Sequence, residues 1–264
     1  MALELITSRE VAAPIGPRIF LCIFGYGGME HYTVEGALRE MLLMAKENTA
    51  FALHMVHGDA LISRSRSKAF SVFMESGNFD VCVMLDHDIQ WQPGALLGLA
   101  KKAHERQALT AGIYACRGFG RGCASRLNQE ASKFTPGEDK LLEAEYLATG
   151  FWACPRTVGE EILKNGTERV ELFQSHDKFS PVVANWKITE CVYNDGTFFY
   201  DYFRPIAVPS TLPATPHEYA SEDWAFSWRA RQANPNRPLY AWTLPHLVHH
   251  GSYGFTMKTA YLRE

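Results

Sequence analysis

The sequence lacks long hydrophobic runs and any strong excess of charge of one sign. Its 264 residues contain 26 Lys and Arg against 29 Asp and Glu, a formal net charge of -3. Such a balance creates no global field that attracts a polyanion, so a nucleic-acid partner would need a local basic patch. The longest purely apolar stretches, such as 81–85, fall far short of the roughly 20 residues that span a bilayer. We therefore expect no membrane association.

Paired cysteines are also lacking. The six cysteines show no C-x-x-C spacing, and Cys22 and Cys82 lie inside apolar segments. Buried reduced thiols are therefore expected, rather than disulfides or a zinc site. A signal peptide is not indicated, because residues 1–18 have no charged start followed by a long apolar run. These absences predict a cytoplasmic protein.

The first half of the chain alternates segments typical of strands and of helices. Apolar runs predict strands at 18–24, 51–56, 80–85 and 109–114, and amphipathic segments predict helices at 34–47, 61–75 and 93–105. Pro93 is expected in the first turn of the third helix. This succession predicts an α/β fold with a doubly wound, mostly parallel sheet and helices on both faces.

The helix at 34–47 is expected to be amphipathic, with one buried face and charged residues elsewhere. The residues predicted for the buried face are Leu38, Met41, Leu42 and Ala45. Glu40 is expected among the solvent-facing charges.

The second half is less regular. A strand at 147–154 is expected to enter a helix near Pro155, and Asn194-Asp195-Gly196 indicates a hairpin. Ser221 is a suitable N-cap for a helix over 221–232. Because no linker or low-complexity tract interrupts the chain, we expect a single domain over 1–264.

Asp86-His87-Asp88 directly follows the apolar segment 80–85. Ligands of open α/β sheets bind beyond the carboxyl ends of the strands. Two carboxylates at such an end suit Mg²⁺ or Mn²⁺, which take carboxylate oxygens together with phosphate oxygens and water. A solvated turn after a strand is the simpler interpretation of the same residues, so the motif alone leaves both open.

The surroundings of this motif resemble those in GT-A glycosyltransferases, where a helix opened by an Ala-Arg-Asn type motif precedes a strand and Asp-x-Asp. In SRSKAFSVFMESGNFDVCVMLDHD (65–88), Arg66 and Ser67 occupy the Arg-Asn positions. The serine and the longer spacing to the aspartates depart from the commonest members. GDALISRSR (58–66) and AGIYACR (111–117) resemble phage-type members of the group.

This resemblance implies transfer of a sugar from a nucleotide diphosphate, expected to be UDP, to a hydroxyl with help from Mn²⁺ or Mg²⁺. The nucleotide-binding half would cover about 18–115 and the acceptor-binding half about 116–255. The implied donor-binding residues are Phe24, Tyr26, Asp59, Arg66, Asp86, Arg117 and Gly150. The implied metal ligands are Asp86, Asp88 and either His249 or His250. An imidazole ligand favours manganese.

Ser221-Glu222-Asp223 opens the predicted last helix. In inverting members of the resembled group, an aspartate at this point removes the proton from the acceptor hydroxyl, which implies Asp223 as the base with help from Glu222. Helix capping explains the same three residues without catalysis. Arg117 opens the glycine-rich segment RGFGRG (117–122), which lacks the Gly-Lys-Ser/Thr ending of a P-loop.

The acceptor and the reaction class leave alternatives. Some resembled phage enzymes glycosylate hydroxymethylated bases in DNA, and aromatic residues could grip such a base. The candidates are Trp152, Trp186, Phe198, Phe199 and Tyr200. Polysaccharide or protein acceptors suit the same aromatics. Nucleotidyl transfer is less favoured because GYGGMEH (25–31) carries no lysine, and a non-catalytic sugar-nucleotide-binding protein is the third alternative.

Overall fold

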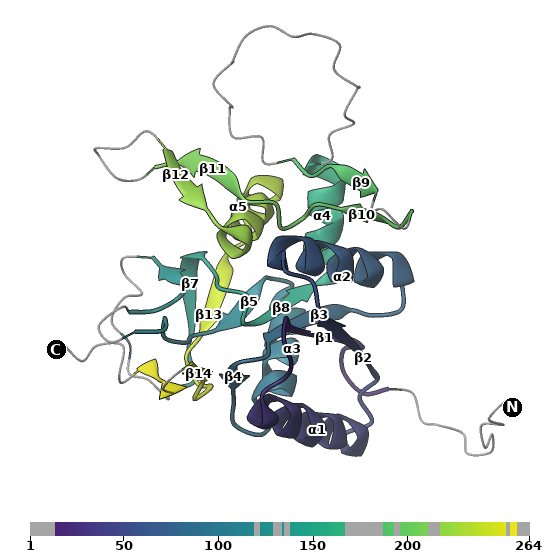
Figure 1. The fold of residues 1–264 in the computed structure, drawn as a ribbon, viewed down its shortest axis with the longest axis vertical. Coiled ribbons are helices and arrows are strands. Elements are labelled where there is room, and N and C mark those ends of the chain that lie inside the picture. Colours follow the sequence, from purple (N-terminus) through teal and green to yellow (C-terminus); the bar gives the residue numbers. More distant parts are fainter. Residues whose placement is uncertain are drawn as a thin grey trace, which may run out of the picture.

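The computed structural model describes residues 14–118, 122–128, 134, 138–166, 187–192, 196–210, 217–251 and 254–257. A sheet of eight strands, in the order β2-β1-β3-β8-β5-β13-β7-β6, forms the centre of the molecule (Figure 1). Its strands are β1 (Ile19–Gly25), β2 (Phe51–His57), β3 (Val81–Asp86), β5 (Thr110–Gly112), β6 (Arg126–Leu127), β7 (Leu141–Tyr146), β8 (Phe151–Pro155) and β13 (Leu239–Trp242). The predicted mixed α/β fold with a mostly parallel central sheet is confirmed.

The order of the strands departs from a simple succession of parallel units. β1 pairs in parallel with β2 and β3, as expected. Between β3 and β5 lies β8, which is antiparallel to both. β13, close to the end of the described chain, then pairs in parallel with β5. Pairing of this kind depends on contacts between distant segments, and the local periodicity of a strand does not reveal its neighbours.

Helices cover both faces of the sheet (Figure 1). α1 (His31–Lys46) and α3 (Ala95–Arg106) lie on one face, and α2 (Ile62–Ser76), α4 (Arg156–Gly166) and α5 (Glu222–Ala233) lie on the other. Alternate residues of the strands serve the two layers: Leu21 packs into the α1/α3 core, whereas Cys22 packs into the α2/α4/α5 core. This period of two is that of a sheet buried on both sides.

The predicted buried face of α1 is wrong. Leu38 and Leu42 are 55% and 73% exposed, whereas Glu40 is fully buried. The Glu40 carboxylate accepts hydrogen bonds from the backbone N–H groups of Gly94, at 2.6 Å, and Leu97, at 3.3 Å. These N–H groups belong to the start of α3, where helix donors have no partner within the helix. The inward face of α1 therefore includes a charged residue, Glu40, whose polar contact with the start of α3 accounts for its burial.

The start of α3 also differs from the prediction. Pro93 and Gly94 form a turn, and the helix begins at Ala95 with Gly94 as its N-cap in the left-handed region (φ 83°). The left-handed conformation suits glycine, which has no Cβ. The predicted strand before Pro155 and the helix after it are both present, as β8 and α4.

The remaining elements are short. They are β4 (Ile89–Gln90), β9 (Glu190–Val192), β10 (Phe198–Tyr200), β11 (Ile206–Pro209), β12 (His217–Ala220), β14 (Val248–His250) and β15 (Gly254–Phe255). β9 and β10 form the predicted antiparallel hairpin, although Asn194 and Asp195 of its turn lie outside the described residues. α5 starts after Ser221, as predicted. All six cysteines are free. In the described part of the chain, each helix is too short or too polar to cross a membrane.

Candidate functional site

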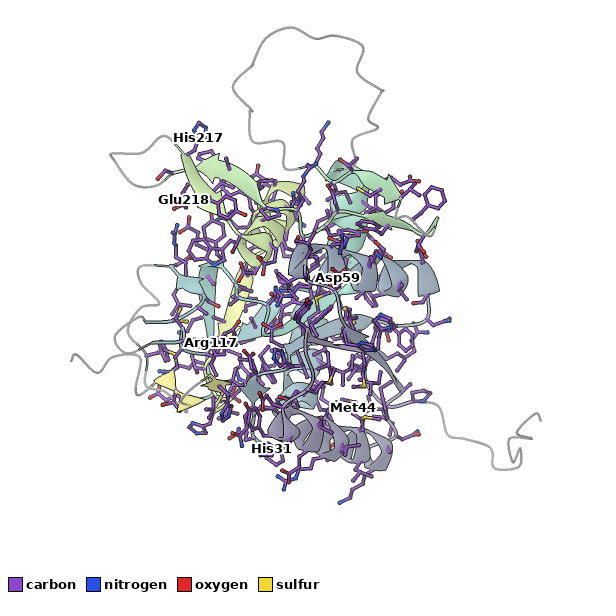
Figure 2. All side chains as sticks on the ribbon, in the orientation of Figure 1. His31, Met44, Asp59, Arg117, His217 and Glu218 are labelled. Atoms are coloured by element: carbon purple, nitrogen blue, oxygen red, sulfur yellow. The ribbon has the colours of Figure 1, made fainter. Side chains whose placement is uncertain are left out.

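A cleft opens at the carboxyl ends of β1 and β3. It has a volume of about 310 Å³. Its walls come from the loops after β1 and β2, the start of α2, the turn after β3, the start of α5 and the segment after β5. Figure 2 labels Asp59 and Arg117, two of the lining residues. The predicted site residues that line it are Phe24, Tyr26, Asp59, Arg66, Asp86, Asp88, Arg117 and Glu222.

Arg66 is the buried cation of this cleft. Its side chain is only 3% exposed, and it forms ion pairs with Asp86 (2.5 Å) and Glu222 (2.9 Å). The arginine therefore joins the end of β3 to the start of α5, two elements that are distant in the sequence. A buried guanidinium requires a carboxylate partner, because an unpaired charge shielded from water is costly.

The two acidic residues at the start of α5 have different surroundings. Glu222 lines the cleft, and burial raises the pKa of its carboxyl while Arg66 opposes that rise. Asp223 accepts hydrogen bonds from the Ser221 hydroxyl and from the backbone N–H of Trp224. These local hydrogen bonds occupy one oxygen of Asp223, and Glu222 is the carboxylate that lines the cleft.

Asp88 belongs to a second charged cluster. Its side chain is 8% exposed, forms an ion pair with Arg117, and lies 3.6 Å from the Nε2 atom of His249. Arg117 donates from Nε to the same His249 Nε2 at 3.1 Å. Figure 2 shows Arg117 close to β14, the strand that carries His249. Asp86 and Asp88 therefore serve two different sets of partners.

His249 is oriented as a metal ligand would be. Its Nδ1 lies 2.9 Å from the carbonyl oxygen of Ala115. A carbonyl can only accept, so Nδ1 carries the proton and the Nε2 lone pair faces Asp88. Burial lowers the pKa of His249, which keeps the imidazole neutral. A carbonyl that accepts the other ring N–H, and so fixes the tautomer, is a regular feature of metal-bound histidines.

The residues present fit a divalent cation held jointly by protein and substrate. Asp88 offers an oxygen and His249 a nitrogen, a donor set that Mn²⁺ would accept, and the guanidinium of Arg117 contacts both side chains. Among the described residues, no group of three or more His, Cys, Asp or Glu side chains could hold a metal. Two protein ligands are enough where diphosphate oxygens and water complete the coordination.

His250 points elsewhere. Its Nε2 lies 2.8 Å from Oε1 of Gln90, and its ring stacks on Tyr32 with ring centroids 3.7 Å apart. Its backbone N–H donates to the Asp88 carbonyl at 2.8 Å, which ties β14 to the turn after β3. Of the two adjacent histidines, His249 is the one beside Asp88.

Buried polar contacts that the sequence did not indicate hold the Asp86-His87-Asp88 turn in place. The Thr33 hydroxyl donates to the carbonyl of His87 at 2.6 Å, and the Asp86 N–H donates to the carbonyl of Gly150 at 3.0 Å. Thr33 is fully buried at the start of α1. A threonine in the first turn of a helix has no sequence feature that reveals such a role.

Gly150 supports Asp86 by leaving room for a tyrosine. A Cβ at this position would lie 2.6 Å from the Tyr114 hydroxyl and 3.1 Å from Oδ2 of Asp86. The Gly150 N–H donates to that hydroxyl at 2.9 Å. The space beside Gly150 is thus filled by Tyr114, and Gly150 is not among the residues that line the cleft.

The remaining donor-side candidates line the same cleft. Phe24 is buried at the end of β1, and Tyr26 is 67% exposed in the loop that follows. Asp59 pairs with Arg64, whose hydrogen bonds lower the pKa of Asp59 to about 2. Figure 2 shows Asp59 beside α2. The lining of the cleft therefore includes aromatic rings and a carboxylate held by an arginine.

The aromatic residues predicted to grip an acceptor base do not form one surface. Trp152 is fully buried within the sheet and Phe199 is 8% exposed, whereas Phe198 is 58% exposed. Trp152 is therefore a core residue that packs against Phe203 and Phe226. Trp186 lies outside the described residues.

Comparison with known proteins defines the fold. No family model and no curated protein matches the sequence. Among solved structures, A197 from STIV is 13% identical, with 92% of this chain and 91% of that chain covered at a TM-score of 0.50. A likeness of this kind shows a shared fold and agrees with the GT-A-like α/β arrangement expected from the sequence.

More distant likenesses extend to two proteins of known name. GalNAc-T7, solved with UDP, GalNAc and Mn²⁺, is 8% identical over 88% of this chain and 43% of that chain, at a TM-score of 0.41. Apo UDP-glucose pyrophosphorylase is 10% identical over 88% of this chain and 93% of that chain, also at 0.41. Likeness at this level does not distinguish between reactions, so the function must be argued from the residues of the cleft.

Proposed function

We propose that this protein is a metal-dependent glycosyltransferase that moves a sugar from a nucleotide diphosphate, UDP in the first instance, to an acceptor hydroxyl. The observation that carries the proposal is the position of Asp88. This buried carboxylate lies in the turn directly after the central strand β3, is 3.6 Å from the Nε2 atom of His249, and lines a cleft that Tyr26 and Glu222 also line. Residues proposed to hold the cation, to contact the nucleotide and to act as the catalytic base thus line one cleft.

The donor is expected to bind along the cleft. Tyr26 and Asp59 would contact the nucleoside, with Phe24 as the floor, and Asp86 would contact the ribose or metal-bound water. Asp88 and His249 would hold Mn²⁺ together with the diphosphate. The cation, when bound, supplies charge neutralisation for the departing diphosphate. Arg66 pairs with both Asp86 and Glu222 and would hold these carboxylates beside the donor.

Glu222 is the carboxylate best placed to remove the proton from the acceptor hydroxyl. It faces the cleft, and a raised pKa makes a carboxylate a stronger base. Asp223, the aspartate implied by the family resemblance, remains the second candidate for this step. If the reaction retains stereochemistry, the diphosphate would take the proton and the two residues would stabilise charge instead.

Several classes of acceptor suit the proposed reaction. A hydroxyl of a glycan or protein and the hydroxymethyl group of a modified DNA base are all compatible with the chemistry. Binding of DNA would weaken steeply with added salt, because phosphate contacts release counterions. A panel that contains an oligosaccharide, a protein hydrolysate and hydroxymethylated DNA would separate them.

The proposal is tested by incubation of the protein with UDP-sugars, Mn²⁺ and the acceptor panel, with products detected by mass spectrometry. We expect transfer or slow donor hydrolysis in the native protein, and a loss of roughly 100-fold or more in Asp88→Asn. Asp139→Asn is the matched control, because Asp139 is half exposed, pairs with Lys102 and does not line the cleft. Equal turnover by the Asp88 variant and the control would refute the assignment.

A further inference from the structure

Arg117 contacts both side chains that would hold the proposed divalent cation. Its guanidinium pairs with Asp88, and its Nε–H donates to His249 Nε2 at 3.1 Å. These are the oxygen and the nitrogen that the donor set offers to a metal. The imidazole nitrogen has a single lone pair, so it cannot accept from Arg117 and coordinate a cation at the same time.

We infer that Arg117 is an internal competitor of the divalent cation, and that it exchanges Asp88 and His249 for the diphosphate when the cation binds. The inference rests on the proposed function. It gives Arg117 two opposite effects: Arg117 would weaken the binding of the cation and strengthen the binding of the nucleotide.

Burial and charge explain why a competitor is needed. Asp88 is 8% exposed, and a carboxylate that is so shielded from water requires a positive partner. Arg117 supplies that partner while remaining 52% exposed. Its guanidinium is therefore only partly desolvated in the ion pair and regains water when it leaves. An ion pair with a half-exposed arginine contributes only modestly to stability. A divalent cation bound to Asp88 and His249 would therefore displace Arg117.

Release leaves Arg117 in contact with the cleft. The residue lines the cavity together with Asp86 and Asp88. A guanidinium presents parallel N–H donors that match a phosphate. Once the cation neutralises Asp88, the nearest anion for Arg117 is the diphosphate held by that cation.

The exchange predicts two effects of opposite sign, and direct binding measurements test them. Mn²⁺ alone, titrated and followed by electron paramagnetic resonance, should bind about fivefold more tightly to Arg117→Gln than to the native protein. UDP, titrated by calorimetry in saturating Mn²⁺, should bind at least about fivefold more weakly to the same variant. The affinities of Arg117→Lys for Mn²⁺ and for UDP should lie between those of the native protein and Arg117→Gln. Lysine keeps the positive charge but loses the paired N–H donors of the guanidinium.

Arg39→Gln is the matched control, since Arg39 is a surface arginine that pairs with Glu35 on α1 and does not line the cleft. It should leave both affinities unchanged. Unchanged or weaker Mn²⁺ binding by Arg117→Gln, beside normal binding by the native protein, would overturn the competition and leave the proposed function standing. Absence of Mn²⁺ binding by both the native protein and Arg117→Gln would overturn the metal site and the competition together.

Discussion

Single residues in this cleft act through the charges around them. Glu222 has Arg66 at 2.9 Å as its compensating cation, while burial and the nearby carboxylates of Asp223 and Asp86 raise its pKa. Asp223 shares the same helix turn, but one of its oxygens accepts two local hydrogen bonds. Two adjacent carboxylates therefore differ in what they can do.

The pH dependence of turnover should identify the base. A base works only as the carboxylate, so kcat/KM is expected to fall as pH drops through the raised pKa of Glu222. The acid limb should therefore lie above the ordinary glutamate value of 4.5. In Glu222→Gln we expect kcat/KM to fall roughly 100-fold or more and this limb to disappear.

Asp223→Asn provides the comparison for that profile. It keeps an oxygen that can accept from Ser221 and Trp224, so a capping role predicts a small change in rate and an unaltered acid limb. A profile that loses its acid limb in Asp223→Asn and keeps it in Glu222→Gln would assign the base to Asp223 instead.

At the scale of elements, α1 shows how a polar contact can decide which face of a helix is buried. Glu40 on α1 is fully buried against the first N–H groups of α3. Burial raises the pKa of Glu40 above its ordinary value of 4.5, although these N–H groups oppose the rise. The folded protein therefore binds this proton more tightly than the unfolded chain does.

The stability that Glu40 contributes should depend on pH with a definite sign. Because its folded pKa is raised, this contribution is greatest below about pH 4.5 and is lost as pH rises through the folded value. Each unit between the folded and unfolded pKa corresponds to about 1.4 kcal/mol. Urea unfolding of native protein and Glu40→Gln at several pH values should show the native advantage declining over this window.

Glu35→Gln is the control on the same helix, since Glu35 is 57% exposed. Its difference from the native protein should vary little with pH. A native-minus-variant difference for Glu40→Gln that stays constant from about pH 4 to 8 would contradict a titrating buried carboxylate.

The elements themselves were largely predictable, and their contacts were not. Apolar runs located β1, β2 and β3, and a serine N-cap located the start of α5, because these signals are local. The exposed Leu38 and Leu42 and the buried Glu40 reverse the pattern of α1. No local signal could show that the partner of Glu40 is the N-terminus of another helix.

The sequence likewise indicated residues of the candidate site but not the contacts between them. Asp86, Asp88, His249 and Arg66 were identified, and the structure brings them to one end of the sheet. The partners of Arg66 and the guanidinium beside Asp88 were not foreseen, because each pairing joins residues separated by 20 or more positions along the chain. Charge pairing across such distances depends on the strand order.

At the scale of the whole molecule, ligand binding should be measurable as thermal stability. UDP supplied at about 100 times its Kd in saturating Mn²⁺ would add about 2.7 kcal/mol to the stability measured in Mn²⁺ alone. For a protein of this size, that corresponds to a rise in Tm of roughly 5–10 °C. Differential scanning calorimetry should show this rise for the native protein and for Asp139→Asn.

The same experiment with Asp88→Asn should give a much smaller rise, because the cation that links UDP to the protein is lost. Chelation of Mn²⁺ by EDTA should reproduce that result in the native protein. An equal rise in the Asp88 variant would show that UDP binds without the proposed cation site.

The pairing of β14 with β4 has a consequence for how far the molecule can be divided. β4 follows Asp88, and β14 carries His249. A cut between the two expected halves, after residue 115, would leave Asp88 on one fragment and both Arg117 and His249 on the other. Arg66 would likewise be separated from Glu222. The cleft is therefore not a module that either fragment could carry into another protein, and metal affinity would report directly on whether two such fragments had reassembled.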